Sequence, residues 1–487
     1  MKRKNVLIIV IIGLICSLAV FYLSEGVRAA LSGSNQVDLR KANNDRQAAT
    51  SIFPLAENTS YQMDLYLDVL TRTLYGQSLI ATINTSGQVL SEICLTIYPQ
   101  AFQSANSSPA PAGAYYQGFS AGGIQIKQIK VNGQNTEYLV DGIALRAMLL
   151  RDLLPGEEVK IDISWQVQVP RSGYRYGVKD GVFMLGHTYP SLNVLTAKGW
   201  HSPSNSPYGD PFCLAAANYL VRINLPQEYS LATSGELVAS LALDNGRVNH
   251  LIKAEMVRDF CLTACAGYET LQQQDDVVKL KCLVPAKMTS PGTALLEEAA
   301  QILKYYNCLW GSYPYREIKI VVTPMQGFAG MEYAGVVYLS QDQLDRPGLS
   351  NLLAHEIAHQ WWYGLVGNDQ YDEPWLDEGL ASYGASLYLA HKQGRPLAPP
   401  GVVKPVNLKR GLSDFASQGQ YQATVYQGGE LFWWALEQEL GHHKVQKILR
   451  SYLAAYKYQM ASTSDLKNII NQESHRDMSL FFSRWSL

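Results

Sequence analysis

The spacing of apolar residues changes near residue 280, and this change constrains the fold more than any other feature of the sequence. Before it, apolar and polar residues alternate with a period of two, most clearly from Val159 to Val169, as expected for half-buried strands. Similar runs occupy Tyr61–Val69, Leu220–Pro226 and Glu236–Leu243. Strands separated by short turns are typical of an antiparallel β saddle or sandwich.

After residue 280 the apolar residues follow a helical period. With 487 residues, the chain is expected to have more than one hydrophobic core. We therefore predict a multidomain α+β protein, with a β-rich domain at 59–278 and a mainly helical domain at 279–487. Asp372 is the expected N-cap of the helix that runs towards Gly394. Helices are expected over Ala294–Leu309, Leu349–Tyr363, from after Asp372 to Gly394, Gln427–Leu440, His443–Tyr456, Asp465–Asn471 and Met478–Trp485, with a short strand at Glu317–Val322.

The first 58 residues predict a membrane anchor and a stalk. Three basic residues at 2–4 precede 18 apolar residues, Val6–Leu23, which as a helix would be about 27 Å long, close to the thickness of a bilayer core. Since the basic flank is expected to stay cytoplasmic, residues 1–30 form a single-pass transmembrane anchor and 31–58 a polar stalk, and the rest lies on the extracytoplasmic side of the cell membrane. The alternative is a signal peptide cleaved near 27–29, which would lead to secretion.

Charge and cysteine content limit the classes of partner. The formal net charge is −2 and no long run of like charge is present, so the composition favours neither nucleic acid nor an electrostatically held membrane surface. Seven cysteines are too few for a disulfide scaffold of this length, although there is room for one or two bridges. We interpret Cys261 and Cys265 as buried thiols rather than half of a metal site, because no second Cys or His pair is near.

The segment LLAHEIAHQWWYG, Leu352–Gly364, predicts a metal site. His355 and His359 are four residues apart, so on a helix both imidazoles project from one face and can share a zinc ion, with Glu356 beside them. A zinc site that keeps one position open needs a third protein ligand. Glu378 in WLDEGLASY can supply it from a second, antiparallel helix. If the segment with His355 and His359 is considered without Glu378, the alternative to a metal site is a helix whose histidines serve only in packing.

HEIAHQWW followed by EPWLDEGLASY resembles the aminopeptidase N family of zinc peptidases, which are gluzincins and include leukotriene hydrolase. Four further segments extend the resemblance from about Tyr61 to the C-terminus: AGMEYAG, YQATVYQGGELFWWALEQELG, YGDPFCLAAANYLVRINLP and MSLFFSRW. The resemblance implies a single zinc ion and a β saddle followed by a thermolysin-like catalytic domain. It also implies a short form that lacks the C-terminal domains of larger relatives and has an open cleft.

The implied reaction is hydrolysis of the N-terminal peptide bond of peptides by attack of a zinc-bound water. Glu356 is then the general base. Tyr426 stands where the family keeps a catalytic tyrosine that stabilises the oxyanion, and Tyr421 is the weaker candidate. Asp369 and Asp377 are candidates for orienting the imidazole ligands.

AGMEYAG corresponds to the family's exopeptidase motif. Glu332 is therefore expected to bind the substrate's α-amine, next to Met331 and to Gly330, which would let the backbone approach the substrate closely. Three positions depart from the family pattern, since the usual Gly, Asn and Lys are replaced by Ala329, Tyr333 and Gly428.

Two other functions remain open beside the aminopeptidase. One is a zinc endopeptidase with the same metal centre, and the other is a non-catalytic scaffold that binds peptides. The expected partners are peptide substrates and, through the N-terminal helix, the membrane; the oligomeric state is open. The remaining histidines are expected to be structural or solvated: His187, His201, His391, His442, His443 and His475.

Overall fold

The computed structural model describes residues 59–487 except 197–198, 202–203, 276–277 and 400. The predicted anchor at 1–30 and stalk at 31–58 lie outside the described residues. Among the described residues, no helix has both the length and the apolar character needed to cross a bilayer. Of the described residues, those within 59–242 and 246–487 belong to one compact unit.

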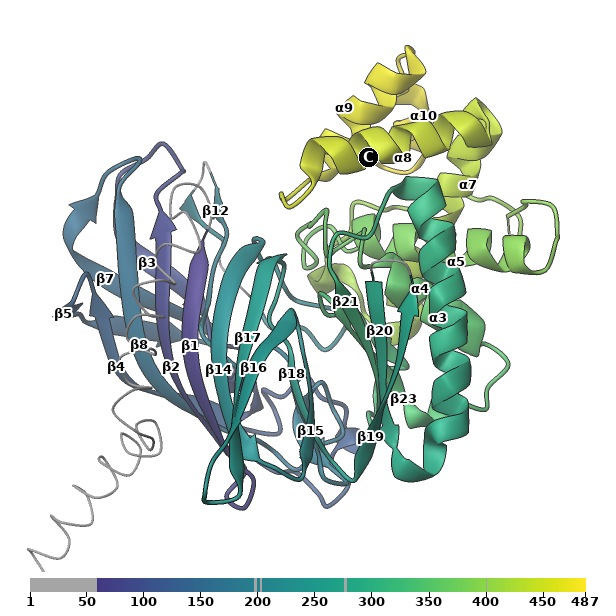
Figure 1. The fold of residues 1–487 in the computed structure, drawn as a ribbon. Helices are drawn as coiled ribbons and strands as arrows, with labels where there is room; N and C mark the ends of the chain where they lie inside the picture. Colours follow the sequence, from purple (N-terminus) through teal and green to yellow (C-terminus); the bar gives the residue numbers. More distant parts are fainter. Residues whose placement is uncertain (1–58, 197–198, 202–203, 276–277, 400) are drawn as a thin grey trace, which may run out of the picture. The chain divides into compact units, whose positions relative to one another are not determined.

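An eight-stranded sheet dominates the β-rich part (Figure 1), with strands in the order β16-β17-β14-β1-β2-β8-β4-β5. Because β1 runs parallel to β14, with Tyr61 beside Tyr219, the prediction of an entirely antiparallel sheet is wrong at this pair. Alternation within one strand does not reveal its partner or direction, which depend on distant contacts. The bounds are β1 Ser60–Asp68, β2 Thr73–Ile83, β4 Gly123–Val131, β5 Gln134–Asn135, β8 Glu158–Gln168, β14 Ala217–Pro226, β16 Glu236–Ala242 and β17 Arg247–Val257.

Two four-stranded sheets and one two-stranded sheet complete the β-rich part. The first contains β11 Ser191–Leu192, β3 Leu90–Thr96, β7 Ala144–Leu153 and β6 Tyr138–Asp141. The second contains β15 Tyr229–Thr233, β18 Leu262–Ala266, β10 Val182–Leu185 and β9 Tyr176–Lys179, and the smallest pairs β12 Leu195–Thr196 with β13 Gly199–Trp200. Short helical turns lie at η1 Tyr98–Phe102 and η2 Ala112–Ala114.

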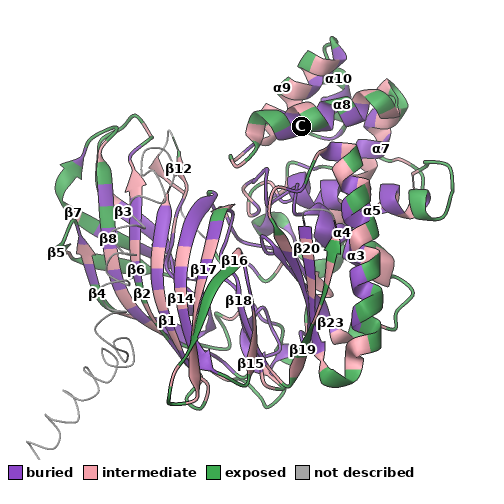
Figure 2. Cartoon of the chain, viewed as in Figure 1, coloured by how far each residue is buried: buried purple, intermediate pink, exposed green. Residues whose placement is uncertain are grey.

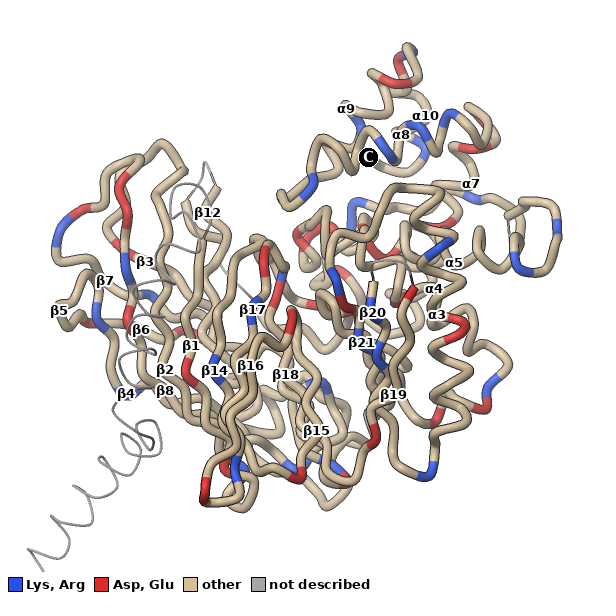
Figure 3. The backbone as a smooth tube through the Cα atoms, viewed as in Figure 1, with Lys and Arg blue, Asp and Glu red and all other residues tan. Residues whose placement is uncertain are grey.

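Burial follows the predicted alternation. Along β8, Val159, Ile161, Ile163 and Val167 are inaccessible to solvent and Trp165 is 2% exposed, while the residues that alternate with them are intermediate or exposed (Figure 2). The edge strand β16 is mostly exposed. Basic and acidic residues are interspersed along the chain (Figure 3). Cys261 and Cys265 are buried free thiols, as predicted.

The helical part is built around a five-stranded sheet in the order β19-β20-β21-β23-β22, in which β20, β21 and β23 run parallel. The predicted domain boundary at 278/279 stays a prediction; β19, which precedes it, pairs with β20. The strands are β19 Tyr268–Asp275, β20 Val278–Pro285, β21 Glu317–Thr323, β22 Gly330–Met331 and β23 Val336–Ser340. The helices are α3 Thr289–Trp310, α4 Leu349–Ala358, α5 Trp375–Lys392, α6 Gln418–Tyr421, α7 Gly429–Leu440, α8 His442–Tyr456, α9 Thr463–Ser474 and α10 Ser479–Arg484, with turns η3 Ala286–Met288, η4 Gln341–Gln343, η5 Leu412–Asp414 and the π-helical η6 Gln422–Gly428.

Two predicted helix limits are wrong. The helix expected to reach Tyr363 ends at Ala358, because the chain tightens there, with the Trp361 N–H donating to the Ala358 carbonyl, and Tyr363 then takes a φ of 134°. Asp372 is not an N-cap, since α5 begins at Trp375 after Pro374. The carboxylate of Asp369 instead accepts hydrogen bonds from the backbone N–H groups of residues 371 and 372, which forms a separate turn before the helix.

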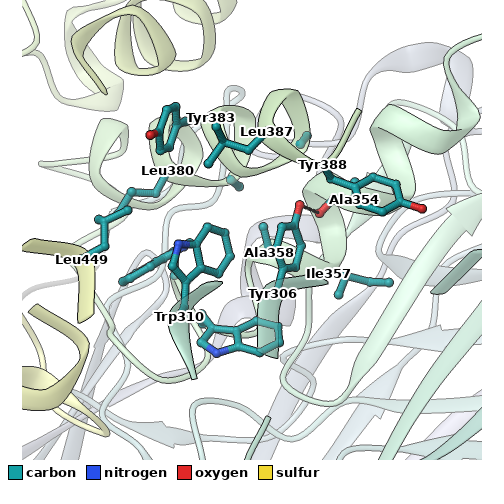
Figure 4. Close-up of a cluster of buried hydrophobic side chains, with 14 of the residues drawn as sticks. Tyr306, Trp310, Ala354, Ile357, Ala358, Leu380, Tyr383, Leu387, Tyr388 and Leu449 are labelled. Carbon is teal, nitrogen blue, oxygen red and sulfur yellow. Dashed lines mark hydrogen bonds between the residues drawn. The ribbon is translucent and has the colours of Figure 1, made fainter. Parts of the chain in front are cut away.

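Aromatic packing holds α4 between α3 and α5 (Figure 4). Tyr306 and Trp310 of α3 stack with ring centroids 4.4 Å apart, and the Tyr306 hydroxyl donates a 3.0 Å hydrogen bond to the carbonyl of Ala354 in α4. Gly384 of α5 leaves room for the Trp310 ring, since a Cβ there would lie 2.6 Å from it. This packing determines which face of α4 points away from the core.

Arg258 joins the β-rich part to the helical part. It follows β17 and is only 1% exposed. Its guanidinium donates hydrogen bonds of 3.0–3.1 Å to the carbonyls of Leu214, Tyr363, Leu365 and Gln459. Three segments distant in sequence therefore share one buried cation.

Substitution Arg258→Ala should lower the free energy of unfolding by at least about 3 kcal/mol, because several buried carbonyls lose a charged donor. Urea denaturation followed by circular dichroism measures the change. The control is Arg146→Ala, which removes an ion pair to Glu92 in which the arginine side chain is 45% exposed and should cost less than about 1 kcal/mol. Equal effects of the two substitutions would contradict the role of Arg258.

Candidate metal centre and its cleft

Two helices bring the three predicted metal ligands together. His355 of α4 and His359 at its C-terminal end present their Nε2 atoms 3.1 Å apart. Glu378 of α5 places Oε2 3.1 Å from Nε2 of His355 and 3.3 Å from Nε2 of His359. One ligand atom from each side chain lies within 4.8 Å of the other two. Two imidazole nitrogens and one carboxylate oxygen are a donor set that fits a single zinc ion with an open position.

The imidazole of His359 is oriented by backbone. Its Nδ1 lies 3.0 Å from the carbonyl of Trp362, which can only accept, so Nδ1 carries a proton and Nε2 is the nitrogen directed at the candidate metal site. Nδ1 of His355 lies 3.5 Å from the hydroxyl of Ser382. The aspartates proposed for this task have other partners among the described residues: Asp369 pairs with His201, and Asp377 accepts from Asn368 and Gln370.

The pKa values of the two acids beside the histidines are shifted in opposite directions. Burial alone would raise the pKa of Glu378, but hydrogen bonds from both imidazoles lower it well below its ordinary value. For Glu356 burial dominates and, together with the neighbouring charge of Glu378, raises the pKa to about 8. A cation bound between them would favour the charged form of both carboxylates.

Two glycines set the distance between α5 and the segment that carries Tyr426. A Cβ on Gly379 would lie 2.8 Å from Cα of Gly429, and a Cβ on Gly429 would lie 2.7 Å from Cα of Gly379. This contact lets the Tyr426 hydroxyl, on the π-helical η6, donate a hydrogen bond to Oε1 of Glu378. Gly428, where the family has lysine, is buried, and a Cβ there would meet Val406 at 2.4 Å.

The predicted exopeptidase motif and the three candidate metal ligands line one cleft, which has a volume of about 370 Å³. Glu332 is only 6% exposed, and its carboxylate accepts a 3.4 Å hydrogen bond from Gln370. Glycine at position 330 makes room for the side chain of Glu356, because a Cβ on residue 330 would lie 2.2 Å from Oε1 of Glu356. Met331 lines the cleft but is buried in an apolar cluster. Tyr333 also belongs to that cluster, with its hydroxyl against Gly186.

Several polar residues of the cleft are absent from the sequence-based prediction, among them Ser382, Ser386, Glu430 and Asp210. Ser382 and Ser386 lie four and eight residues after Glu378, and Glu430 lies four residues after Tyr426, so helical spacing alone could have placed them on the same faces. Asp210 comes from the β-rich part, where it pairs with the fully buried Arg175. Its only signal in the sequence is a charged residue within the otherwise apolar and aromatic run YGDPF.

Substitution Glu378→Ala should weaken zinc binding at this centre by at least about 100-fold, more than is usual for residues that only orient ligands. Competition with a chromophoric chelator measures the affinity. Glu430→Gln is the matched control, because Glu430 lines the same cleft but bonds to Ser386 and Trp434, and it should leave the affinity unchanged. Equal affinity in the original chain and in Glu378→Ala would exclude Glu378 as a ligand.

Comparisons with known proteins agree with this geometry. Residues 294–485 match the peptidase family M1 domain. Leukotriene A-4 hydrolase of Xenopus laevis is 23% identical over 379 residues, which are 71% of this chain and 61% of that protein. Aminopeptidase 2 of Candida albicans is 26% identical over 236 residues, 42% of this chain and 25% of that protein. The chain thus spans less than two thirds of the length of these relatives.

A solved structure shares the fold. The M1 zinc metallopeptidase from Deinococcus radiodurans superposes with a TM-score of 0.64 at 18% identity, over 88% of this chain and 93% of that one. The β-rich part followed by a helical part is therefore an arrangement found in this class of structure. Residues 294–485 match the peptidase family M1 domain, and the resemblance of the chain to this family of zinc peptidases is confirmed.

Proposed function

We propose that this protein is a zinc-dependent aminopeptidase that hydrolyses the N-terminal peptide bond of peptides. The observation that carries the proposal is the placement of His355, His359 and Glu378 in one cleft with two further buried acids, Glu332 and Glu356. The name of the Candida albicans relative, aminopeptidase 2, supports the same activity.

Glu356 is the proposed general base. Zinc at the three ligands would supply a Lewis acid that polarises the substrate carbonyl and lowers the pKa of water. Glu356 takes a proton from the attacking water and passes it to the leaving amine. Burial raises the pKa of its carboxyl group to about 8, and the charge of a bound cation would lower it again.

Glu332 is the proposed anchor for the substrate's amine. Its carboxylate is buried, and among the described residues no lysine or arginine pairs with it; the hydrogen-bond partner is the amide of Gln370. Burial, with the charge of Asp210, raises the pKa of Glu332 well above its ordinary value. A substrate ammonium would supply the missing positive charge through a charge-assisted hydrogen bond, which favours peptides with a free N-terminus.

Tyr426 is the proposed donor to the oxyanion. Burial and the neighbouring charge of Glu378 raise its pKa, so the phenol stays protonated and can donate to oxygen that gains negative charge. Tyr421 is less suited, since it is packed in an apolar cluster with Leu412 and Phe415.

The location of the protein remains a proposal from the sequence. An anchor at residues 1–30 would hold the zinc peptidase domain at the extracytoplasmic side of the cell membrane, and cleavage of the same segment would secrete it. The domain division at 278/279 is a proposal of the same kind.

Substitution Glu356→Gln should lower kcat/KM for unblocked aminoacyl substrates by about 10²–10⁴-fold, the usual contribution of a general base, while the bound zinc is retained. Fluorogenic hydrolysis and metal content are measured on the same samples. The surface variant Glu439→Gln, in which an ion pair to Arg476 is lost, should keep full activity. If the original chain with zinc hydrolyses no peptide, the non-catalytic scaffold becomes the better interpretation.

Substitution Glu332→Gln should lower kcat/KM for a free-amine dipeptide by about 10–100-fold, the value of one charged hydrogen bond, mainly through KM. Hydrolysis of the N-acetylated dipeptide, which has no ammonium group, should be slow and unaffected by the substitution. Steady-state kinetics on both substrates provide the comparison. Equal rates on the two substrates by the original chain would favour a zinc endopeptidase instead.

A further inference from the structure

A second group of potential metal ligands lies outside the catalytic cleft. It consists of His201, just after β13, Cys213, just before β14, and Asp369, in the loop between α4 and α5. One imidazole nitrogen, the thiol sulfur and one carboxylate oxygen lie within 4.8 Å of one another. Nε2 of His201 is 2.8 Å from Oδ2 of Asp369.

The three donors are held in place by their surroundings. Oδ1 of Asp369 accepts from the backbone N–H groups of Tyr371 and Asp372, which leaves Oδ2 directed at His201. The backbone N–H of His201 donates a 2.8 Å hydrogen bond to the carbonyl of Val194. The N–H of Gln370 donates a 3.0 Å hydrogen bond to the carbonyl of Phe212, which fixes the neighbouring Cys213 against the Asp369 loop. The donors are therefore positioned before any ion arrives.

The catalytic centre provides an internal comparison. There, too, an imidazole Nε2 lies about as close to a carboxylate oxygen, at 3.1 Å in the case of His355 and Glu378. An ion pair between histidine and aspartate is complete without a thiol. Imidazole, thiolate and carboxylate together, in contrast, form a donor set suited to zinc and to related divalent ions. The side chains of His201 and Asp369 are 18% and 20% exposed, so an ion can reach them from solvent.

We propose that His201, Cys213 and Asp369 bind a second zinc ion that is structural. Binding would release the thiol proton of Cys213 to solvent and displace the proton between Nε2 of His201 and Oδ2 of Asp369, because thiolate, unprotonated imidazole nitrogen and carboxylate are the ligands. The ion would join the segment between β13 and β14 in the β-rich part to the loop between the helices that carry the catalytic ligands. Gln370, next to Asp369, donates to Asp377 and Glu332, so the second ion would stabilise the supports of the catalytic cleft.

Cobalt substitution tests this site separately from the catalytic one, because the catalytic ligands include no thiolate. The full chain is stripped of metal, titrated with cobalt chloride, and examined for bound ions and for thiolate-to-cobalt charge-transfer absorption in the near ultraviolet. We expect two ions per chain and a charge-transfer band that Glu378→Ala leaves in place. Cys213→Ser should lose the band and one ion, and His201→Ala should do the same if the serine variant fails to fold.

Cys308→Ser is the matched control, since Cys308 is an exposed free cysteine in α3, and it should keep both the band and two ions. A single bound ion with no charge-transfer band in the original chain would overturn the second site. A band that survives Cys213→Ser would also overturn it, because the thiolate would then come from another cysteine. Neither of these results would bear on the proposed aminopeptidase activity, which depends on the other ion.

Discussion

The burial of acidic side chains around two histidines is the constraint on which the rest of this structure depends. Five carboxylates in this region are at most 7% exposed: Asp210, Glu332, Glu356, Asp377 and Glu378. An unpaired buried charge costs several kcal/mol, yet the guanidinium of Arg175 balances only Asp210. Glu378 contacts both His355 and His359, while burial raises the pKa of Glu332 and Glu356. A divalent ion and a substrate ammonium would complete the charge balance, so ligand binding and local stability are coupled here.

Both parts of the chain contribute to this balance. α4 and α5 supply the ligands, while the β-rich part supplies Asp210 and the buried Arg175. Arg258 then joins the two parts through four backbone carbonyls. The β-rich part therefore supplies part of the wall of the cleft that contains His355, His359 and Glu378.

Local geometry explains which features were predictable from the sequence. Two histidines at i and i+4 must share a helix face, and Glu378 follows on the next helix, so the ligand set could be inferred without a structure. The alternation that predicted β8 is equally local. By contrast, the parallel pairing of β1 with β14 and the approach of Asp210 depend on contacts between residues far apart in the sequence.

The end of α4 was mispredicted for a related reason. Apolar spacing continues through Tyr363, but the chain leaves the helix after Ala358, where the carbonyl of Trp362 orients His359. The orientation of a metal ligand is thus achieved by backbone, which carries no side-chain signal. The two aspartates that were candidates for orienting the imidazoles have other partners. Asp369 pairs with His201, and Asp377 accepts hydrogen bonds from Asn368 and Gln370.

The contact between Gly379 and Gly429 has a consequence for how this protein can diversify. Backbone contacts backbone there, so the distance between Glu378 and the hydroxyl of Tyr426 depends on the absence of side chains at both positions. No residue is smaller than glycine, so variation among descendants of this chain should accumulate around Gly379 and Gly429 and spare these two positions.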